Sequence, residues 1–111
     1  MMKLWIDDLR KDPDREWAGV AEPEGWIWVK TSEDAIGWLR AQRYFQTPLD
    51  QISFDHDLGG EDTTRKVLTW MIENEYWPKV ITVHSANPVG RDWLLGTAER
   101  YAPEGVEVRR Y

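Results

Sequence analysis

Residues 52–60 constrain the fold of this chain more than any other stretch. Strand-forming residues give way abruptly to polar groups and then to a glycine turn, in the order Ile52-Ser53-Phe54-Asp55-His56-Asp57-Leu58-Gly59-Gly60. This order is typical of the carboxyl end of a strand in an open α/β sheet, the edge where such sheets bind ligands. We therefore expect a functional site at this edge if other strands bring polar side chains to it.

Short apolar runs that resemble strands alternate with helical patterns along the chain. Besides 52–54, the predicted strands are 3–6, 26–29, 80–83 and 106–108. The predicted helices begin at capping residues: Thr31 with Asp34 (ending near Arg43), Asp62 or Thr63, and Asn87 with Pro88 (ending near Tyr101). Strands separated by helices call for a mainly parallel sheet with right-handed crossovers. The sequence thus predicts one three-layer α/β/α domain, 1–111, of about five strands, with a long loop over 9–25.

Composition and charge argue against several classes of function. A net charge of −6 disfavours broad electrostatic binding to nucleic acid, although a metal and a few arginines can still hold one nucleotide or RNA end. The lack of cysteine excludes disulfides and thiolate metal sites. No apolar run approaches the roughly 20 residues that span a bilayer. Because Met1-Met2-Lys3 also opens no signal peptide, we expect a cytoplasmic protein without membrane contact.

Eight tryptophans in 111 residues is an unusual content. Most of them are expected to build the core or to shield sheet edges. Tryptophan is also enriched at the hot spots of protein interfaces, so a Trp-rich surface is a candidate contact for a protein partner.

Three of the predicted strands end in polar side chains. The groups are Asp7-Asp8, Asp55-His56-Asp57 and His84-Ser85. Parallel strands have their carboxyl ends at one edge of the sheet, so these groups can converge on one crevice. Each residue alone has an ordinary structural explanation, as a turn former, a helix cap or a histidine whose ring nitrogens have hydrogen-bond partners. The joint pattern favours a functional site.

The residue types at these strand ends suit chemistry on a phosphate. Clustered carboxylates from Asp7, Asp8, Asp55 and Asp57 need a cation, and oxygen ligands suit Mg²⁺ or Mn²⁺. Two histidines, His56 and His84, could serve as general base and general acid. Ser85 and the helix that begins at Asn87 could hold phosphoryl oxygens. Arg91 is either a further phosphate contact or a surface charge, and Thr63 is a helix cap, a ligand contact or both.

The strand ends resemble the receiver domain of two-component response regulators. In that family the acidic pair after the first strand and the Asp after the third hold Mg²⁺. The resemblance implies that Asp55 is the phosphoacceptor and that Ser85 contacts the phosphoryl oxygens. The chain departs from ordinary receivers at two places. Its last strand lacks the usual Lys-Pro, for which Arg109 is a weak substitute, and the loop over 9–25 replaces the first helix.

A closer resemblance is to the cyclic-phosphate-processing receiver-like domain family. It rests on Ile6-Asp7-Asp8, Ser53-Phe54-Asp55-His56-Asp57-Leu58-Gly59 and His84-Ser85-Ala86-Asn87-Pro88-Val89-Gly90-Arg91. That family keeps the flavodoxin-like receiver framework and adds histidines at the third and fourth strand ends. The resemblance implies an enzyme that processes cyclic phosphates, in RNA repair or in conflict between phage and host.

Three hypotheses for the function follow from these observations. The first is a metal-assisted phosphoesterase that hydrolyses a cyclic phosphate on a nucleotide or RNA end, with Asp55, His56 and His84 as catalytic residues. In it, Thr63, Ser85, Asn87 and Arg91 bind the substrate, and Asp7, Asp8, Asp55 and Asp57 bind the metal. The second is a receiver-like signalling module in which Asp55 is phosphorylated. The third is a non-catalytic phage or mobile-element protein that inhibits a host enzyme.

Overall fold

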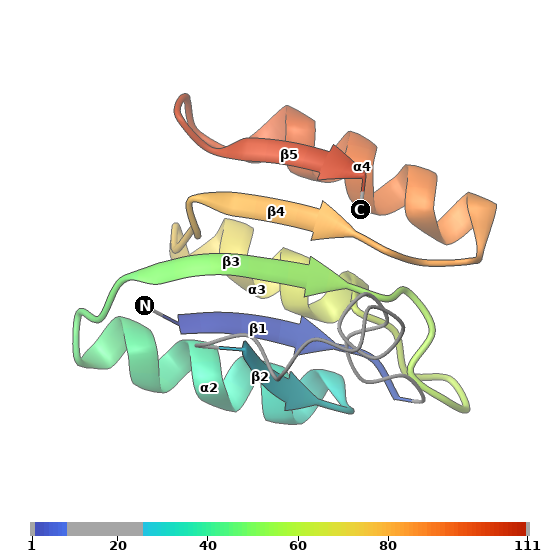
Figure 1. Ribbon diagram of the computed structural model, residues 1–111, viewed down its shortest axis with the longest axis horizontal. Coiled ribbons are helices and arrows are strands. Elements are labelled where there is room, and N and C mark those ends of the chain that lie inside the picture. Colours follow the sequence, from blue (N-terminus) through green and yellow to red (C-terminus); the bar gives the residue numbers. More distant parts are fainter. Residues whose placement is uncertain (1, 9–25, 111) are drawn as a thin grey trace, which may run out of the picture.

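The computed structural model describes residues 2–8 and 26–110, which hold five strands and three helices. The strands are β1 (Met2–Ile6), β2 (Trp26–Val29), β3 (Leu49–Phe54), β4 (Val80–Val83) and β5 (Glu107–Arg110). The helices are α2 (Ser32–Tyr44), α3 (Arg65–Asn74) and α4 (Pro88–Tyr101). All strand pairs are parallel, in the order β2-β1-β3-β4-β5 (Figure 1). This order is that of flavodoxin-like and receiver folds, so the predicted receiver-like fold with a mainly parallel sheet is confirmed.

The core lies between the sheet and the three helices, which are on the same side of the sheet (Figure 1). Leu4, Ile52 and Ile81 are neighbours in register across β1, β3 and β4, and all three side chains are fully buried. Leu68 of α3 and Leu94 of α4 belong to the same buried cluster. A slip of one residue would turn a strand's apolar side chains away from this core, so burial fixes the register of the sheet.

The ladder of hydrogen bonds continues one residue past the central strands. The Asp7 N–H donates to the Val29 carbonyl at 3.0 Å, and the Asp55 N–H donates to the Ile6 carbonyl at 2.9 Å. The His84 N–H donates to the Phe54 carbonyl, also at 2.9 Å. These bonds hold the backbones of the three strand ends side by side before any side chain is considered.

Two of the predicted helix caps are confirmed. Thr31 is the N-cap of α2, and its hydroxyl accepts a hydrogen bond from the Asp34 N–H at 3.1 Å. Asn87 is the N-cap of α4, where its Oδ1 accepts from the Gly90 N–H at 3.1 Å, and Pro88 is the first helical residue. Both bonds satisfy N–H groups that a helix leaves without an internal partner.

The predicted cap of the second helical pattern was wrong. α3 begins at Arg65, and its N-cap is Thr64, not Asp62 or Thr63. The Asp62 carboxylate instead accepts hydrogen bonds from the backbone N–H and the hydroxyl of Ser32, the first residue of α2. The loop after β3 is therefore fastened to the helix that precedes β3, a long-range contact that local sequence does not reveal.

Replacing Asp62 with alanine is expected to destabilise the domain by about 1–2 kcal/mol near neutral pH, because the Ser32 N–H loses its acceptor. Burial disfavours the charged form of Asp62, but its hydrogen bonds from Ser32 and the charge of Lys66 outweigh this and lower its pKa below 3.8. A carboxyl group whose pKa is lowered by folding stabilises the protein at pH values above its ordinary, unfolded pKa. This contribution is lost as the pH falls through the lower pKa of the folded protein. Urea denaturation should therefore show a difference between the two proteins that shrinks in acid. Glu61→Ala, at the exposed neighbouring residue, is the control.

Three strands differ from the predicted ranges: β1 begins at Met2, β3 begins at Leu49, and β5 covers Glu107–Arg110. The Val106 N–H donates to the Pro103 carbonyl in a turn, so β5 begins one residue later, where the Glu107 N–H donates to Lys79. β3 begins at Leu49, because its pairing with β1 starts there. The predicted loop over 9–25 lies outside the described residues. None of the helices described is long and apolar enough to cross a membrane.

Candidate functional site

The carboxyl ends of β1, β3 and β4 border a pocket of about 570 Å³. Its lining consists of Asp7, Asp8, Asp55, Asp57, Gly59, Gly60, Ser85, Ala86 and Asn87. The structure thus gathers at one cavity all four predicted metal ligands and two of the predicted substrate contacts. The convergence follows from the parallel strands, whose last residues share one edge.

Three of the four carboxylates form a compact cluster. Asp7, Asp8 and Asp55 each offer an oxygen, and these oxygens all lie within 4.8 Å of one another. Asp57 lines the pocket but does not belong to this group. Asp7 is only 1% exposed and Asp8 and Asp55 are partly buried, and holding like charges so close together is costly without a cation. An oxygen-only donor set of this kind fits Mg²⁺ or Mn²⁺.

The glycine turn after β3 lies close to the carboxylate cluster. Gly59 has a φ of +91°, a conformation that side chains other than glycine rarely adopt. A Cβ at Gly59 would also come within 3.3 Å of the Asp8 Oδ2. The glycine therefore lets the chain turn beside Asp8 without crowding its carboxylate.

Asp57 is held at the rim of the pocket from two sides. Its Oδ2 accepts a hydrogen bond from the Asn87 Nδ2 at 3.0 Å, and its Oδ1 lies 2.9 Å from the His56 Nδ1. These hydrogen bonds, that of Asn87 first, lower the pKa of Asp57 below its ordinary value. Asp57 is therefore a carboxylate at neutral pH, and its side chain is 59% exposed. It can accept a hydrogen bond from a water molecule or substrate in the pocket.

Ser85 and Asn87, the N-cap of α4, also line the pocket. The Asn87 N–H donates to the Ser85 Oγ at 3.1 Å, which leaves the hydroxyl hydrogen of Ser85 available as a donor. The amino end of a helix carries a partial positive charge and attracts phosphate. The pocket therefore brings together a hydroxyl donor, the end of a 14-residue helix and the carboxylates.

His84 lies beneath the carboxylate cluster and not in the lining of the pocket. Its side chain is 3% exposed and stacks on the Trp5 indole, with ring centroids 3.8 Å apart. Its Nε2 lies 3.1 Å from the Asp7 Oδ2, and its Nδ1 lies 2.8 Å from the Ser53 Oγ. Both ring nitrogens of His84 are therefore within hydrogen-bonding distance of a polar side chain. These contacts orient Asp7.

His56 points away from the pocket, towards the start of α3. Its side chain is 7% exposed, and its Nε2 accepts a hydrogen bond from the Arg65 Nε at 2.8 Å. Its other ring nitrogen donates to Asp57. The two histidines therefore do not face one cavity, and their contacts give no support to a general base and general acid acting as a pair.

The other predicted contacts also lie outside the lining of the pocket. The Thr63 hydroxyl accepts from the Arg65 N–H at 3.3 Å, as in a local turn. Arg91 lies 3.7 Å from its neighbour Asp92, and Arg109 pairs with Glu107 at 2.7 Å on the exposed strand β5. Arg109 therefore does not replace the lysine of ordinary receivers at this pocket.

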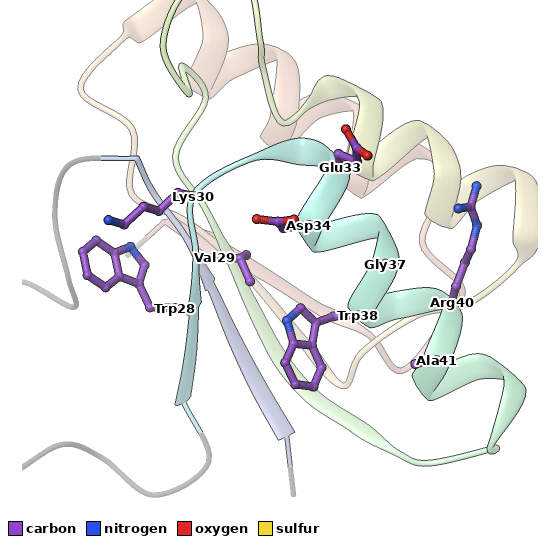
Figure 2. A pocket seen from close by; sticks show the side chains of 9 residues that line it. All are labelled: Trp28, Val29, Lys30, Glu33, Asp34, Gly37, Trp38, Arg40 and Ala41. Carbon is purple, nitrogen blue, oxygen red and sulfur yellow. The ribbon is translucent and has the colours of Figure 1, made fainter.

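A larger hollow, of about 710 Å³, lies between β2 and α2 (Figure 2). Trp28 and Trp38 line it, with the Lys30 Nζ 4.5 Å from the Trp28 ring centroid. None of the predicted site residues belongs to this hollow, so we place the function at the carboxylate pocket. Trp38 is 40% exposed, and every other tryptophan in the described segments is less exposed than this. The Trp-rich contact for a protein partner remains a prediction.

Sequence reasoning missed three residues that shape the site. Ser53 and Arg65 hold the two histidines, and Gly90 packs against the ring of His56. The first two look like an ordinary strand residue and an ordinary helix residue. Gly90 did carry a signal, because a glycine inside a helix is unfavourable and often has a packing reason.

Comparison with known proteins agrees with this arrangement. A model of the family described as the cyclic-phosphate processing receiver domain matches residues 2–100, which include every residue that lines the carboxylate pocket. No curated protein and no solved structure shows significant similarity to the chain. The family match spans most of the sequence, and the fold and strand order agree with a receiver. The chain therefore belongs to the cyclic-phosphate processing receiver domain family.

Proposed function

We propose that this protein hydrolyses a cyclic phosphate on a nucleotide or RNA end with the help of a divalent metal. One observation carries the proposal. Asp7, Asp8 and Asp55 offer oxygens within 4.8 Å of one another, in the same pocket as Ser85 and the start of α4. A carboxylate cluster that shares a pocket with the amino end of a helix is suited to a phosphate ester, and the family name points to its cyclic form.

The residues of the pocket divide into three tasks. Asp7, Asp8 and Asp55 would hold Mg²⁺ or Mn²⁺, which when bound supplies positive charge against the phosphoryl oxygens. The Ser85 hydroxyl and the amino end of α4 would bind a phosphoryl oxygen. Asp57, an exposed carboxylate at the rim, would accept a hydrogen bond from the attacking water and so orient it.

The proposed reaction balances as the addition of one water molecule. The water oxygen forms a new bond to phosphorus, and one of the two ester bonds of the ring breaks. The leaving ribose oxygen gains a proton, and the water loses one. The product is a phosphate monoester, with no change in oxidation state and no co-reactant other than water.

The test measures opening of nucleoside 2′,3′-cyclic phosphates by the purified protein, with and without Mg²⁺ or Mn²⁺. We expect turnover that depends on the metal, and we expect Asp55→Asn to lower it by more than about 100-fold, because a direct metal contact is lost. Glu99→Gln, at an exposed carboxylate on α4, is the matched control and should retain activity.

Two results would contradict this proposal. One is the absence of turnover over a panel of cyclic mononucleotides and cyclic-phosphate RNA ends with either metal. The other is turnover that Asp55→Asn leaves unchanged. Stable transfer of a phosphoryl group from a small phosphodonor to Asp55, detected by intact mass, would favour a phosphoacceptor role instead.

A further inference from the structure

The imidazole of His56 is fixed by partners on both of its nitrogens. The Arg65 Nε donates to the His56 Nε2 at 2.8 Å, and arginine has no acceptor to offer in return. The Nε2 atom must therefore be without a proton, and the Nδ1 atom donates to the Asp57 Oδ1 at 2.9 Å. Arg65 thus selects the tautomer in which His56 holds Asp57.

The hydrogen bonds continue from Asp57 to the start of α4. The Asp57 Oδ2 accepts from the Asn87 Nδ2 at 3.0 Å. Asn87 in turn caps α4 through Gly90 and donates its N–H to the Ser85 Oγ at 3.1 Å. A continuous series of hydrogen bonds therefore joins Arg65, the first residue of α3, to Ser85 and the start of α4 at the pocket.

Packing against α4 holds Arg65 and His56, the first two members of this series of hydrogen bonds, in place. The Arg65 guanidinium lies over the Trp93 ring of α4, 4.7 Å from its centroid. The His56 ring lies against Gly90, so close that a Cβ there would come within 2.2 Å of it. The arginine and the histidine are both clamped by α4, the helix whose amino end borders the pocket.

We propose that Arg65 and His56 are positioning residues, which hold Asp57 and Asn87 so that Ser85 and the start of α4 can bind a phosphoryl group. The proposal rests on the proposed function for its substrate. It gives His56 a role different from acid–base catalysis. One nitrogen of His56 accepts a hydrogen bond from Arg65, and the other donates one to Asp57. The ring therefore reaches the pocket only through Asp57.

The variant His56→Asn separates a positioning role from acid–base catalysis. Its side-chain amide can donate to Asp57 as Nδ1 does, but it cannot transfer protons as an imidazole does. We expect His56→Asn to open a nucleoside 2′,3′-cyclic phosphate at a rate within about 10-fold of the wild-type rate. We expect the rate of His56→Ala to fall by about 10–100-fold, the range found for supporting contacts around a metal site. Equal losses of about 10²–10⁴ in both variants, the range for general acid–base catalysis, would overturn the proposal.

A second measurement does not depend on turnover. Nitrogen-15 spectra of the imidazoles in the whole protein should show His56 with its proton on Nδ1, and a proton on Nε2 would overturn the proposal. Arg65→Met should abolish this preference and weaken binding of inorganic phosphate in the presence of Mg²⁺, followed at the Asn87 side-chain amide, by about 10-fold or more. Unchanged phosphate binding in Arg65→Met would also overturn it.

Arg100→Met is the matched control for the arginine variant. Arg100 also lies over an aromatic ring, 5.4 Å from the centroid of Tyr101, but it is at the opposite end of α4 from the pocket. We expect it to leave tautomer and phosphate binding unchanged. If the wild-type protein opens no cyclic phosphate, the proposed function fails. The imidazole spectra and phosphate binding still decide whether Arg65 and His56 position this site.

Discussion

Gly90→Ala is expected to destabilise the domain by about 3 kcal/mol or more, at the upper end of the cost of overpacking a core. An added Cβ would lie 2.2 Å from the His56 Cγ and 2.5 Å from its Nδ1, far inside van der Waals contact. Domains of this size have a free energy of unfolding of only about 5–15 kcal/mol. The variant should therefore show a large fall in the urea midpoint, or fail to fold at all.

The His56 ring cannot move aside cheaply to make room for this methyl group. Its two nitrogens are hydrogen-bonded to Arg65 and Asp57, and its side chain is 7% exposed, so a shift breaks two partly buried hydrogen bonds. Moving α4 instead would disturb the fully buried Leu94 one turn further along. Either route adds a cost to the steric clash.

The same substitution at Gly96 is the control, because it lies in the same helix. A Cβ at Gly96 meets nothing within 4 Å, so Gly96→Ala should stabilise the protein by about 0.5–1 kcal/mol through helix propensity. The double variant His56→Ala, Gly90→Ala should be more stable than the sum of the two single changes predicts, since the clash is gone. A Gly90→Ala protein as stable as the wild type would show that the ring is not fixed there.

The sequence was sufficient to predict the architecture and the carboxylate cluster. Apolar runs that stop at Asp7 and Asp55 place both residues at strand ends, and parallel strands bring such ends together wherever the intervening chain runs. Asn87 was predictable for a local reason, because an N-cap bonds to a residue three positions away. These predictions need only periodicity and short spacings.

The orientation of the histidines was not predictable from the sequence. His56 directly follows Asp55 in the sequence, and the sequence suggested that the side chains of both histidines, His56 and His84, face the pocket. The loop through Gly59 and Gly60, both with positive φ, returns the chain so that Arg65 meets the back of the ring. The attachment of Asp62 to Ser32, 30 residues away, depends on the path of the same loop. Such contacts require the loop path, which local propensity does not specify.

His84→Ala is expected to cost about 3–5 kcal/mol, because it removes a partner from a buried carboxylate and leaves a cavity. Asp7 is 1% exposed, and its Oδ2 lies 3.1 Å from the His84 Nε2. The ring is also stacked on the buried Trp5, with an angle of 9° between the planes, and that contact is lost. Urea denaturation measures the loss of stability directly.

His84→Gln distinguishes the hydrogen bond from the packing. Its amide can donate to Asp7 but cannot stack flat on Trp5, so we expect a stability between those of the wild type and His84→Ala. If His84 orients Asp7 for a metal, Mg²⁺ should raise the melting temperature of the wild type more than that of His84→Ala, with His84→Gln again between them. A stability loss below about 0.5 kcal/mol in His84→Ala, within the range of a surface change, would show that Asp7 does not depend on this histidine. A loss of stability with unchanged stabilisation by Mg²⁺ would instead assign His84 to the core alone, because the carboxylate would then keep its geometry without the ring.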